Sequence, residues 1–206
     1  MAKYCYFEVA IKGSSPFCSL FNDQDLKFLE FEDDVEDYYK DAYGLARNYK
    51  QACPVIRDLT IKFLSVVAHE LNLDRNLPKQ PKAVLYFSHA NGFKKLIARL
   101  GLFKDHNPIT VKDFCYFYNK RKWRTTSISP FNANVVFVLY KCEQGSKFYV
   151  ASYLNEKPFM LDGCPAHYCS LDDFLHTPAV YQALECDLKK ICVPTKRELS
   201  KTNTAK

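Results

Sequence analysis

Apolar residues recur every three to four positions in two long segments near the amino terminus, the spacing of one face of an α-helix. The first segment follows Asn22 and carries Phe28, Phe31, Val35, Tyr38, Tyr39 and Ala42. Asn22 can cap this helix with Asp25 in its first turn, and the helix should end near Gly44. A second helix is predicted from Pro54, because proline favours the first helical position, to Leu71. This part of the chain is therefore expected to be helical.

The pattern changes after residues 72–81, a polar, proline-interrupted segment that is typical of a linker. Residues 82–87 form a short apolar run with β-branched and aromatic side chains, which predicts a buried strand. Residues 93–100 then place their apolar side chains on one helical face, closed by Gly101 as a C-cap. His89 should therefore lie on a strand-to-helix turn, where α/β folds gather ligands and where helix N-termini attract anions.

The second half of the chain predicts a hairpin. Residues 134–140 are almost continuously apolar, which favours a strand covered on both faces. The polar residues 143–146 would turn the chain into a second strand over residues 147–153. Ser170, with Asp173 three residues later, resembles the capping box of a short helix.

These elements together predict an α/β fold. We expect a helical lobe over residues 1–76, packed on a partial mixed sheet with flanking helices over residues 77–206. The composition, 48% apolar and 25% charged, is that of a globular protein and excludes disordered and collagen-like classes. No apolar run reaches the roughly 18–20 residues of a membrane helix. The first residues lack the pattern of a signal peptide, and no glycine-rich phosphate loop occurs.

The net charge of +6 is unevenly distributed. Residues 22–41 contain nine acidic and two basic side chains, a net −7 that leaves +13 for the rest of the chain. We expect these acids to form the solvated face of the helix and not a metal site. The basic remainder favours an anionic partner, which could be a phosphorylated small molecule, nucleic acid or a membrane surface. A solvated, lysine-rich surface would produce the same composition.

Nine cysteines are many for a cytosolic protein of this size and favour an oxidising compartment over a set of buried free thiols. The sequence contains no CxxC motif, so its cysteines do not have the spacing that is typical of a zinc site. Short loops could be closed between neighbours in the sequence, namely Cys5 with Cys18, Cys164 with Cys169, and Cys186 with Cys192. A cysteine content typical of an oxidising compartment contradicts the lack of an export signal in this sequence. The simplest hypothesis is that an amino-terminal part is missing.

Segments spread over most of the chain resemble the histidine acid phosphatases, most closely the multiple inositol polyphosphate phosphatases. Phe87-Ser-His-Ala-Asn91 and Leu100-Gly-Leu-Phe-Lys-Asp105 are similar to the second catalytic motif and the end of the helix after it. Further similar segments are residues 15–21, 38–44, 53–54, 122–124, 130–134, 137–142, 154–156 and 163–174. Each match is weak by itself, but their order and spacing together are specific.

The resemblance implies a phosphomonoesterase of the secretory pathway. It would act through a phosphohistidine, without a cofactor or metal, on inositol polyphosphates of the phytate type or on 2,3-bisphosphoglycerate. The family's nucleophilic histidine lies in an Arg-His-Gly-x-Arg-x-Pro motif, and this sequence contains no Arg-His pair. The chain therefore resembles only the later half of the domain. It is expected to lack sheet strands, to expose apolar edges and to be inactive alone.

By the same resemblance, His89 is a phosphate ligand, and Asn91 occupies the position of the family's proton donor, an Asp or Glu. A side-chain amide cannot give up a proton to the leaving alkoxide. Loss of a general acid typically costs about 10²–10⁴-fold in rate. A non-catalytic relative that binds a phosphorylated ligand or a partner protein is therefore the alternative function.

Four cations surround Trp123 and could collect a polyphosphorylated substrate: Lys120, Arg121, Lys122 and Arg124. A solvated basic loop remains an equal interpretation. A nucleic-acid binder resting on this loop ranks last, because the patch is short and no recognition fold is seen. The resemblance also places Cys164 and Cys169 in the family's carboxy-terminal cysteine loop. The odd cysteine, Cys53 or Cys115, could pair with the absent half.

Overall fold

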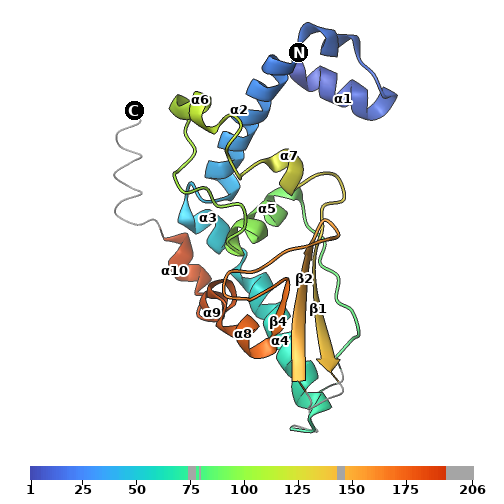
Figure 1. The fold of residues 1–206 in the computed structure, drawn as a ribbon, viewed down its shortest axis with the longest axis vertical. Coiled ribbons are helices and arrows are strands. Elements are labelled where there is room, and N and C mark those ends of the chain that lie inside the picture. Colours follow the sequence, from blue (N-terminus) through green and yellow to red (C-terminus); the bar gives the residue numbers. More distant parts are fainter. Residues whose placement is uncertain (74–77, 79, 143–146, 194–206) are drawn as a thin grey trace.

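The computed structural model describes residues 1–73, 78, 80–142 and 147–193 (Figure 1). The helices are α1 (Ala2–Lys12), η1 (Pro16–Leu20), α2 (Asp23–Asp41), α3 (Ala46–Lys50), α4 (Cys53–Glu70), α5 (Ala90–Arg99), η2 (Val111–Asp113), α6 (Phe114–Phe117), α7 (Thr125–Ile128), α8 (Leu171–His176), α9 (Pro178–Leu184) and α10 (Leu188–Cys192). The strands are β1 (Val135–Cys142), β2 (Lys147–Leu154), β3 (Lys157–Pro158) and β4 (Tyr168–Ser170). Within these ranges, none of the helices combines the length and the apolar character that a bilayer crossing needs.

The predicted helix starts are confirmed. Asn22 caps α2 by accepting hydrogen bonds from the backbone N–H groups of Gln24 (2.8 Å) and Asp25 (3.0 Å). The Asp25 carboxylate accepts the Asn22 N–H in return (3.0 Å), which completes a capping box. Helix α4 contains Pro54 in its first turn, and the Ser170 hydroxyl caps α8. These signals are local in the sequence, so the pattern alone could place them.

The hairpin is also confirmed, as part of an α/β fold with helices flanking the sheet. Strands β1 and β2 pair antiparallel from Val135 opposite Leu154 to Cys142 opposite Lys147, while β3 and β4 pair with β2. The predicted turn over 143–146 lies outside the described residues. The expectation that β1 is covered on both faces is wrong, because its outward side chains Val136 and Tyr140 are exposed.

Residues 82–87 do not form the predicted buried strand. They run in an extended conformation between α4 and α5, and no described strand pairs with them. Leu85 and Phe87 are 77% and 93% exposed, and the Tyr86 hydroxyl donates a hydrogen bond to Asp58 of α4. An apolar, β-branched run fits a pleated, half-buried surface, but it cannot supply the neighbouring strand that would bury it. The exposed apolar segment agrees with the expectation of a partial sheet.

Two apolar clusters form the core. One lies between α4, α8, α9 and β2 and includes Ile56, Val150 and Phe174. The other joins α2 to α5 and to the loop before α7, and includes Phe31 and Trp123. Each cluster contains side chains from before and after the predicted linker. The division of the chain into units 1–76 and 77–206 therefore stays a prediction.

Three disulfides join cysteines of the described chain. The predicted pairs Cys5–Cys18 and Cys164–Cys169 are present, with Cα atoms 4.9 and 5.4 Å apart. The prediction for Cys186 is wrong, because it bonds to Cys53 across a Cα–Cα distance of 6.3 Å and not to Cys192. The packing of α9 against α4 brings these two cysteines together. Cys53 is thus not the odd cysteine; the exposed free cysteines are Cys115, Cys142 and Cys192.

Burial of a phenol in the second cluster predicts a loss of stability in alkali. Burial, with the nearby Tyr39 and Asp105, raises the pKa of Tyr38 to about 12. In the unfolded chain tyrosine ionises near pH 10. The stabilisation is therefore fully present below pH 10 and is lost as the pH rises through about 12. Urea unfolding is expected to show a fall of about 1–3 kcal/mol over this range, and Tyr38→Phe should make the slope shallower.

The control for this prediction is Tyr140→Phe, which removes an exposed phenol from β1. It should leave the alkaline slope unchanged. An equal slope in wild type and Tyr38→Phe would contradict the assignment to Tyr38.

Candidate functional site

The turn before α5 places His89 and Asn91 at the start of a helix. His89 has extended backbone dihedrals (φ −76°, ψ 162°), and its carbonyl oxygen accepts the first helical hydrogen bond, from the Phe93 N–H at 3.1 Å. The side chains of His89 and Asn91 are exposed, and neither makes a hydrogen bond or ion pair with any described residue. The free N–H groups of the first turn carry a partial positive charge. An imidazole, an amide and a helix N-terminus are thus open to one ligand.

Glycine at position 92 keeps this turn compact. A Cβ atom there would overlap the Ser88 hydroxyl oxygen, so the hydroxyl can lie against the first turn of α5 only because residue 92 has no side chain. The Ser88 hydroxyl donates to the His89 carbonyl oxygen at 3.2 Å. Ser88, His89, Asn91 and Gly92 therefore form one polar surface at the start of α5.

The lysines of α5 point away from this surface, toward the acidic residues of α2. The Lys94 ammonium lies 2.7 Å from Asp37 and 3.4 Å from Asp41, and only 7% of its side chain is exposed. Lys95 lies 3.8 Å from Asp41 and donates to the Gln51 side chain. These ion pairs fasten the helix that carries His89 to α2.

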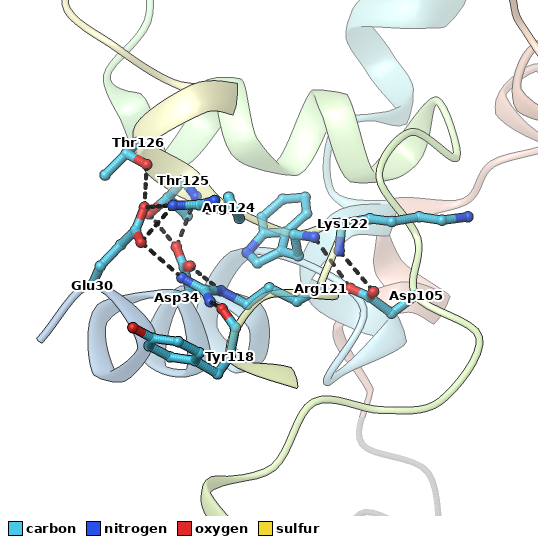
Figure 2. Close-up of polar contacts among 10 residues, drawn as sticks. Glu30, Asp34, Asp105, Tyr118, Arg121, Lys122, Arg124, Thr125 and Thr126 are labelled. Atoms are coloured by element: carbon cyan, nitrogen blue, oxygen red, sulfur yellow. Dashed lines mark hydrogen bonds and ion pairs between the residues drawn. The ribbon is translucent and has the colours of Figure 1, made fainter. Parts of the chain in front are cut away.

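Arg121, in the predicted basic loop, forms a buried ion pair with α2. Its guanidinium Nε donates to Asp34 Oδ2 at 2.6 Å, and Nη2 donates to Glu30 Oε2 at 3.1 Å (Figure 2). A third bond runs from Nη1 to the Tyr118 carbonyl oxygen at 2.6 Å. The guanidinium carbon lies 5.3 Å from the centre of the Phe31 ring. Arg121 is 4% exposed, so its charge is already neutralised inside the protein.

The other cations of the loop are more accessible. Arg124 donates to both carboxylate oxygens of Glu30 (2.7 and 2.9 Å) and keeps 45% of its side chain exposed. The Lys122 side chain is exposed, while its backbone N–H donates to Asp105 at 2.8 Å (Figure 2). Lys120 is exposed and holds its ammonium 5.3 Å from the centre of the Tyr116 ring. No hydrogen bond or ion pair connects this loop with His89 or Asn91 in the described ranges.

The pKa values of two carboxylates in the network are shifted in opposite directions. Burial raises the pKa of Glu30, but hydrogen bonds from Thr126 and Arg124 outweigh it and hold the pKa below its usual value. Burial dominates at Asp34 and raises its pKa despite bonds from Thr125 and Arg121. Glu30 therefore stabilises the fold above its ordinary titration range, and this contribution is lost as the pH falls through its lowered pKa.

The expectation that the acids of α2 form only a solvated face is wrong for two of them. Asp34 and Asp41 are 0% and 3% exposed, whereas Glu32, Asp33 and Glu36 are exposed as expected. The sequence did contain a signal. Asp34 follows Phe31 by three residues, and Asp41 follows Tyr38 by three, so each aspartate lies on the apolar stripe. A carboxylate on such a stripe needs a buried cationic partner.

Comparison with known proteins identifies what the chain resembles. The model of the "Histidine phosphatase superfamily (branch 2)" matches residues 1–155. Multiple inositol polyphosphate phosphatase 1 of Gallus gallus is 34% identical over 160 residues, covering 76% of this chain and 35% of the relative. The protein of the same name from Homo sapiens is 35% identical over 161 residues, covering 74% of this chain and 32% of the relative. The chain thus spans about a third of the length of these relatives.

A solved structure shows the same fold. The crystal structure of the phytase from D. castellii superposes with a TM-score of 0.65 at 21% sequence identity. The match covers 95% of this chain and 40% of the phytase chain. The arrangement of helices around the β1–β2 hairpin is therefore shared with a larger protein.

Proposed function

The chain belongs to the histidine phosphatase superfamily (branch 2), and from this premise we propose that it forms the leaving-group side of a phosphomonoesterase site for inositol polyphosphates. The observation that carries the proposal is the exposed imidazole of His89 at the N-terminus of α5. Two of its relatives carry the name multiple inositol polyphosphate phosphatase 1. An oxidising, secretory compartment fits the three disulfides.

His89 would bind the phosphoryl group of the substrate. A neutral imidazole donates one N–H, and the first-turn amides of α5 add donors and a positive potential, so that a phosphate oxygen can be held between them. Such donors stabilise the charge of a transferring phosphoryl group. Transfer itself needs a nucleophilic histidine, and the family's Arg-His-Gly motif is absent from this sequence.

Asn91 would contact the leaving oxygen without protonating it. Its exposed amide lies two residues after His89, in the first turn of α5. An amide can donate a hydrogen bond to an alkoxide but keeps its proton. The same observation favours a second candidate function, in which the protein binds phosphorylated ligands or a partner without turnover.

The basic loop would add electrostatic attraction for a polyanion. Because Arg121 is buried between Glu30 and Asp34, the collecting role falls on Lys120 and Lys122, with the half-exposed Arg124 beside them. Exposed ammonium groups attract phosphates over about 8–10 Å at physiological salt. This role should weaken steeply as salt rises.

Calorimetric titration of the 206-residue chain with inositol hexakisphosphate, followed by a phosphate-release assay, tests the proposal. We expect saturable binding without phosphate release. His89→Ala should weaken binding about 10-fold or more, because it removes a hydrogen bond to a charged group. His69→Ala, at an exposed position on α4, is the matched control and should bind like wild type.

Phosphate release tests the roles that both candidate functions assign to this chain. Asn91→Asp in this chain should bind the ligand and still release no phosphate, since no nucleophile is present. Brisk phosphate release from the purified wild-type chain would overturn the assignment of roles. Absence of saturable binding, or equal binding by His89→Ala, would overturn the phosphate-ligand role of His89.

A further inference from the structure

A cavity lies at the opposite end of α5 from His89. It has a volume of about 450 Å³, lies between α3, the last turn of α5, α9 and α10, and is lined by Arg47, Lys50, Arg99, Gln182 and Lys190, among others. Helix α5 has ten residues, so the two ends are roughly 15 Å apart at 1.5 Å per residue. The cavity is large enough for a small ligand. It is therefore separate from the candidate site at the start of the helix.

Arg99 is a buried cation without a carboxylate partner among the described residues. It is 7% exposed, and the only hydrogen bond of its side chain to the described residues runs from Nη1 to Gln182 Oε1 at 3.1 Å. Its Nε–H is fully buried and unpaired in the described part of the chain. Burial lowers the pKa of Arg99, which shows that its surroundings disfavour the charge. The C-terminal end of α5 offers only a partial negative charge in compensation.

Arg121 and Arg99 differ in how their buried guanidinium groups are paired. Both guanidinium groups are buried, at 7% and 4% exposure. Arg121 binds two carboxylates and a carbonyl oxygen, whereas Arg99 binds one neutral amide. A buried guanidinium is normally paired with an anion. Among the described residues no anion pairs with Arg99, and the side chain borders a cavity.

The remaining charges of the cavity also favour an anion. Arg47 and Lys50 come from α3 and Lys190 from α10, so with Arg99 the lining has four cations against two carboxylates. Both carboxylates are engaged. Asp187 caps α10 by accepting the N–H groups of Lys189 and Lys190, and its carboxylate also lies 3.9 Å from the Lys190 ammonium. Glu185 hydrogen-bonds to Tyr181. The cavity therefore has unused donors and a net positive charge.

We propose that this cavity binds a phosphate group, with Arg99 as the buried anchor and Arg47, Lys50 and Lys190 around its mouth. A phosphate presents the charge and the several acceptor oxygens that a guanidinium fork recognises. The group could be inorganic phosphate or the phosphate of an ester, since both offer the same oxygens. This site goes beyond the function proposed above, because it uses neither His89 nor Asn91.

Calorimetric titrations with sodium phosphate and with glycerol 2-phosphate test the proposal, in a His89→Ala background that removes the other candidate ligand. We expect saturable binding of one equivalent of at least one of the two. Saturation by both identifies free phosphate as a sufficient ligand, and saturation by the ester alone identifies a phosphoester. Both results support the site. Failure of both ligands to saturate would overturn it.

Two variants assign the binding to the cavity. Arg99→Gln should weaken binding about 10-fold or more, the usual effect of losing a hydrogen bond between charged groups. The double variant Arg47→Gln/Lys50→Gln changes accessible side chains of α3 and should weaken binding to a similar extent with an unchanged melting temperature. It decides the question if Arg99→Gln does not fold.

The matched control is Lys141→Gln, which removes one positive charge from β1, where the lysine pairs with Glu70 at 2.7 Å. It should bind phosphate like the His89→Ala parent. If the Arg47/Lys50 double variant also binds like the parent, the cavity is not the site and the proposal is wrong.

Discussion

Replacement of Arg121 by methionine is expected to lower the free energy of unfolding by about 3–5 kcal/mol, because it leaves a carboxylate buried without its counter-ion. Asp34 is 0% exposed and lies 2.6 Å from Arg121 Nε. Without the guanidinium, the hydrogen bonds that the described residues still give Asp34 are those from the N–H and hydroxyl of Thr125, each at 2.7 Å. Urea unfolding monitored by circular dichroism measures the loss.

Two further variants show whether the loss of stability comes from the unpaired Asp34 carboxylate. Arg124→Gln breaks an ion pair to Glu30 that is half exposed, so it should cost less than about 1 kcal/mol. Arg121→Met/Asp34→Leu removes both partners and should recover most of the stability, since an apolar pair of similar volume often replaces a buried ion pair without loss. If the double variant is no more stable than Arg121→Met, the deficit lies in packing and not in charge.

The second large effect is expected at the disulfide between Cys53 and Cys186. The bond closes a sequence separation of 133 residues, and chain-entropy arguments assign about 3–5 kcal/mol to a loop of this size. It also joins the start of α4 to the connection that follows α9, next to the first core cluster. Cys186→Ser should therefore lower the free energy of unfolding by this amount in urea, under non-reducing conditions.

The chain provides matched controls for the disulfide. Cys192→Ser changes an exposed free thiol six residues later and should leave stability within about 0.5 kcal/mol of wild type. Cys169→Ala opens a separation of only five residues and should cost less, about 2 kcal/mol by the same entropy argument. Equal losses in Cys186→Ser and Cys192→Ser would contradict the pairing of Cys53 with Cys186.

Features decided by neighbouring residues could be predicted from the sequence. The capping box of Asn22 and Asp25 involves groups three residues apart, and the hairpin of β1 and β2 joins two strands that follow each other directly in the sequence. The disulfides Cys5–Cys18 and Cys164–Cys169 close short loops, and both were predicted. Local geometry restricts such groups to a few partners, so the pattern is sufficient.

Features that depend on a distant partner could not be predicted in this way. The apolar run 82–87 has the composition of a strand, but its burial depends on a neighbour elsewhere in the fold. Cys186 lies near Cys192 in sequence, yet the packing of α9 on α4 selects Cys53. At the candidate site, the basic composition of residues 120–124 predicted attraction for an anion. It could not show that the carboxylates of α2 already neutralise Arg121.

Helix α2 forms ion pairs with two parts of the protein that are far apart from it in sequence, the loop of Arg121 and helix α5. Asp34 and Glu30 hold the loop of Arg121, and Asp37 and Asp41 hold Lys94 of α5. The two anchor regions are about two helical turns apart on one rod, roughly 10 Å at 1.5 Å per residue. A change that tilts or frays α2 would consequently displace the His89 turn and the lysines of the loop together. The distance between these two regions therefore depends on the geometry of a single helix.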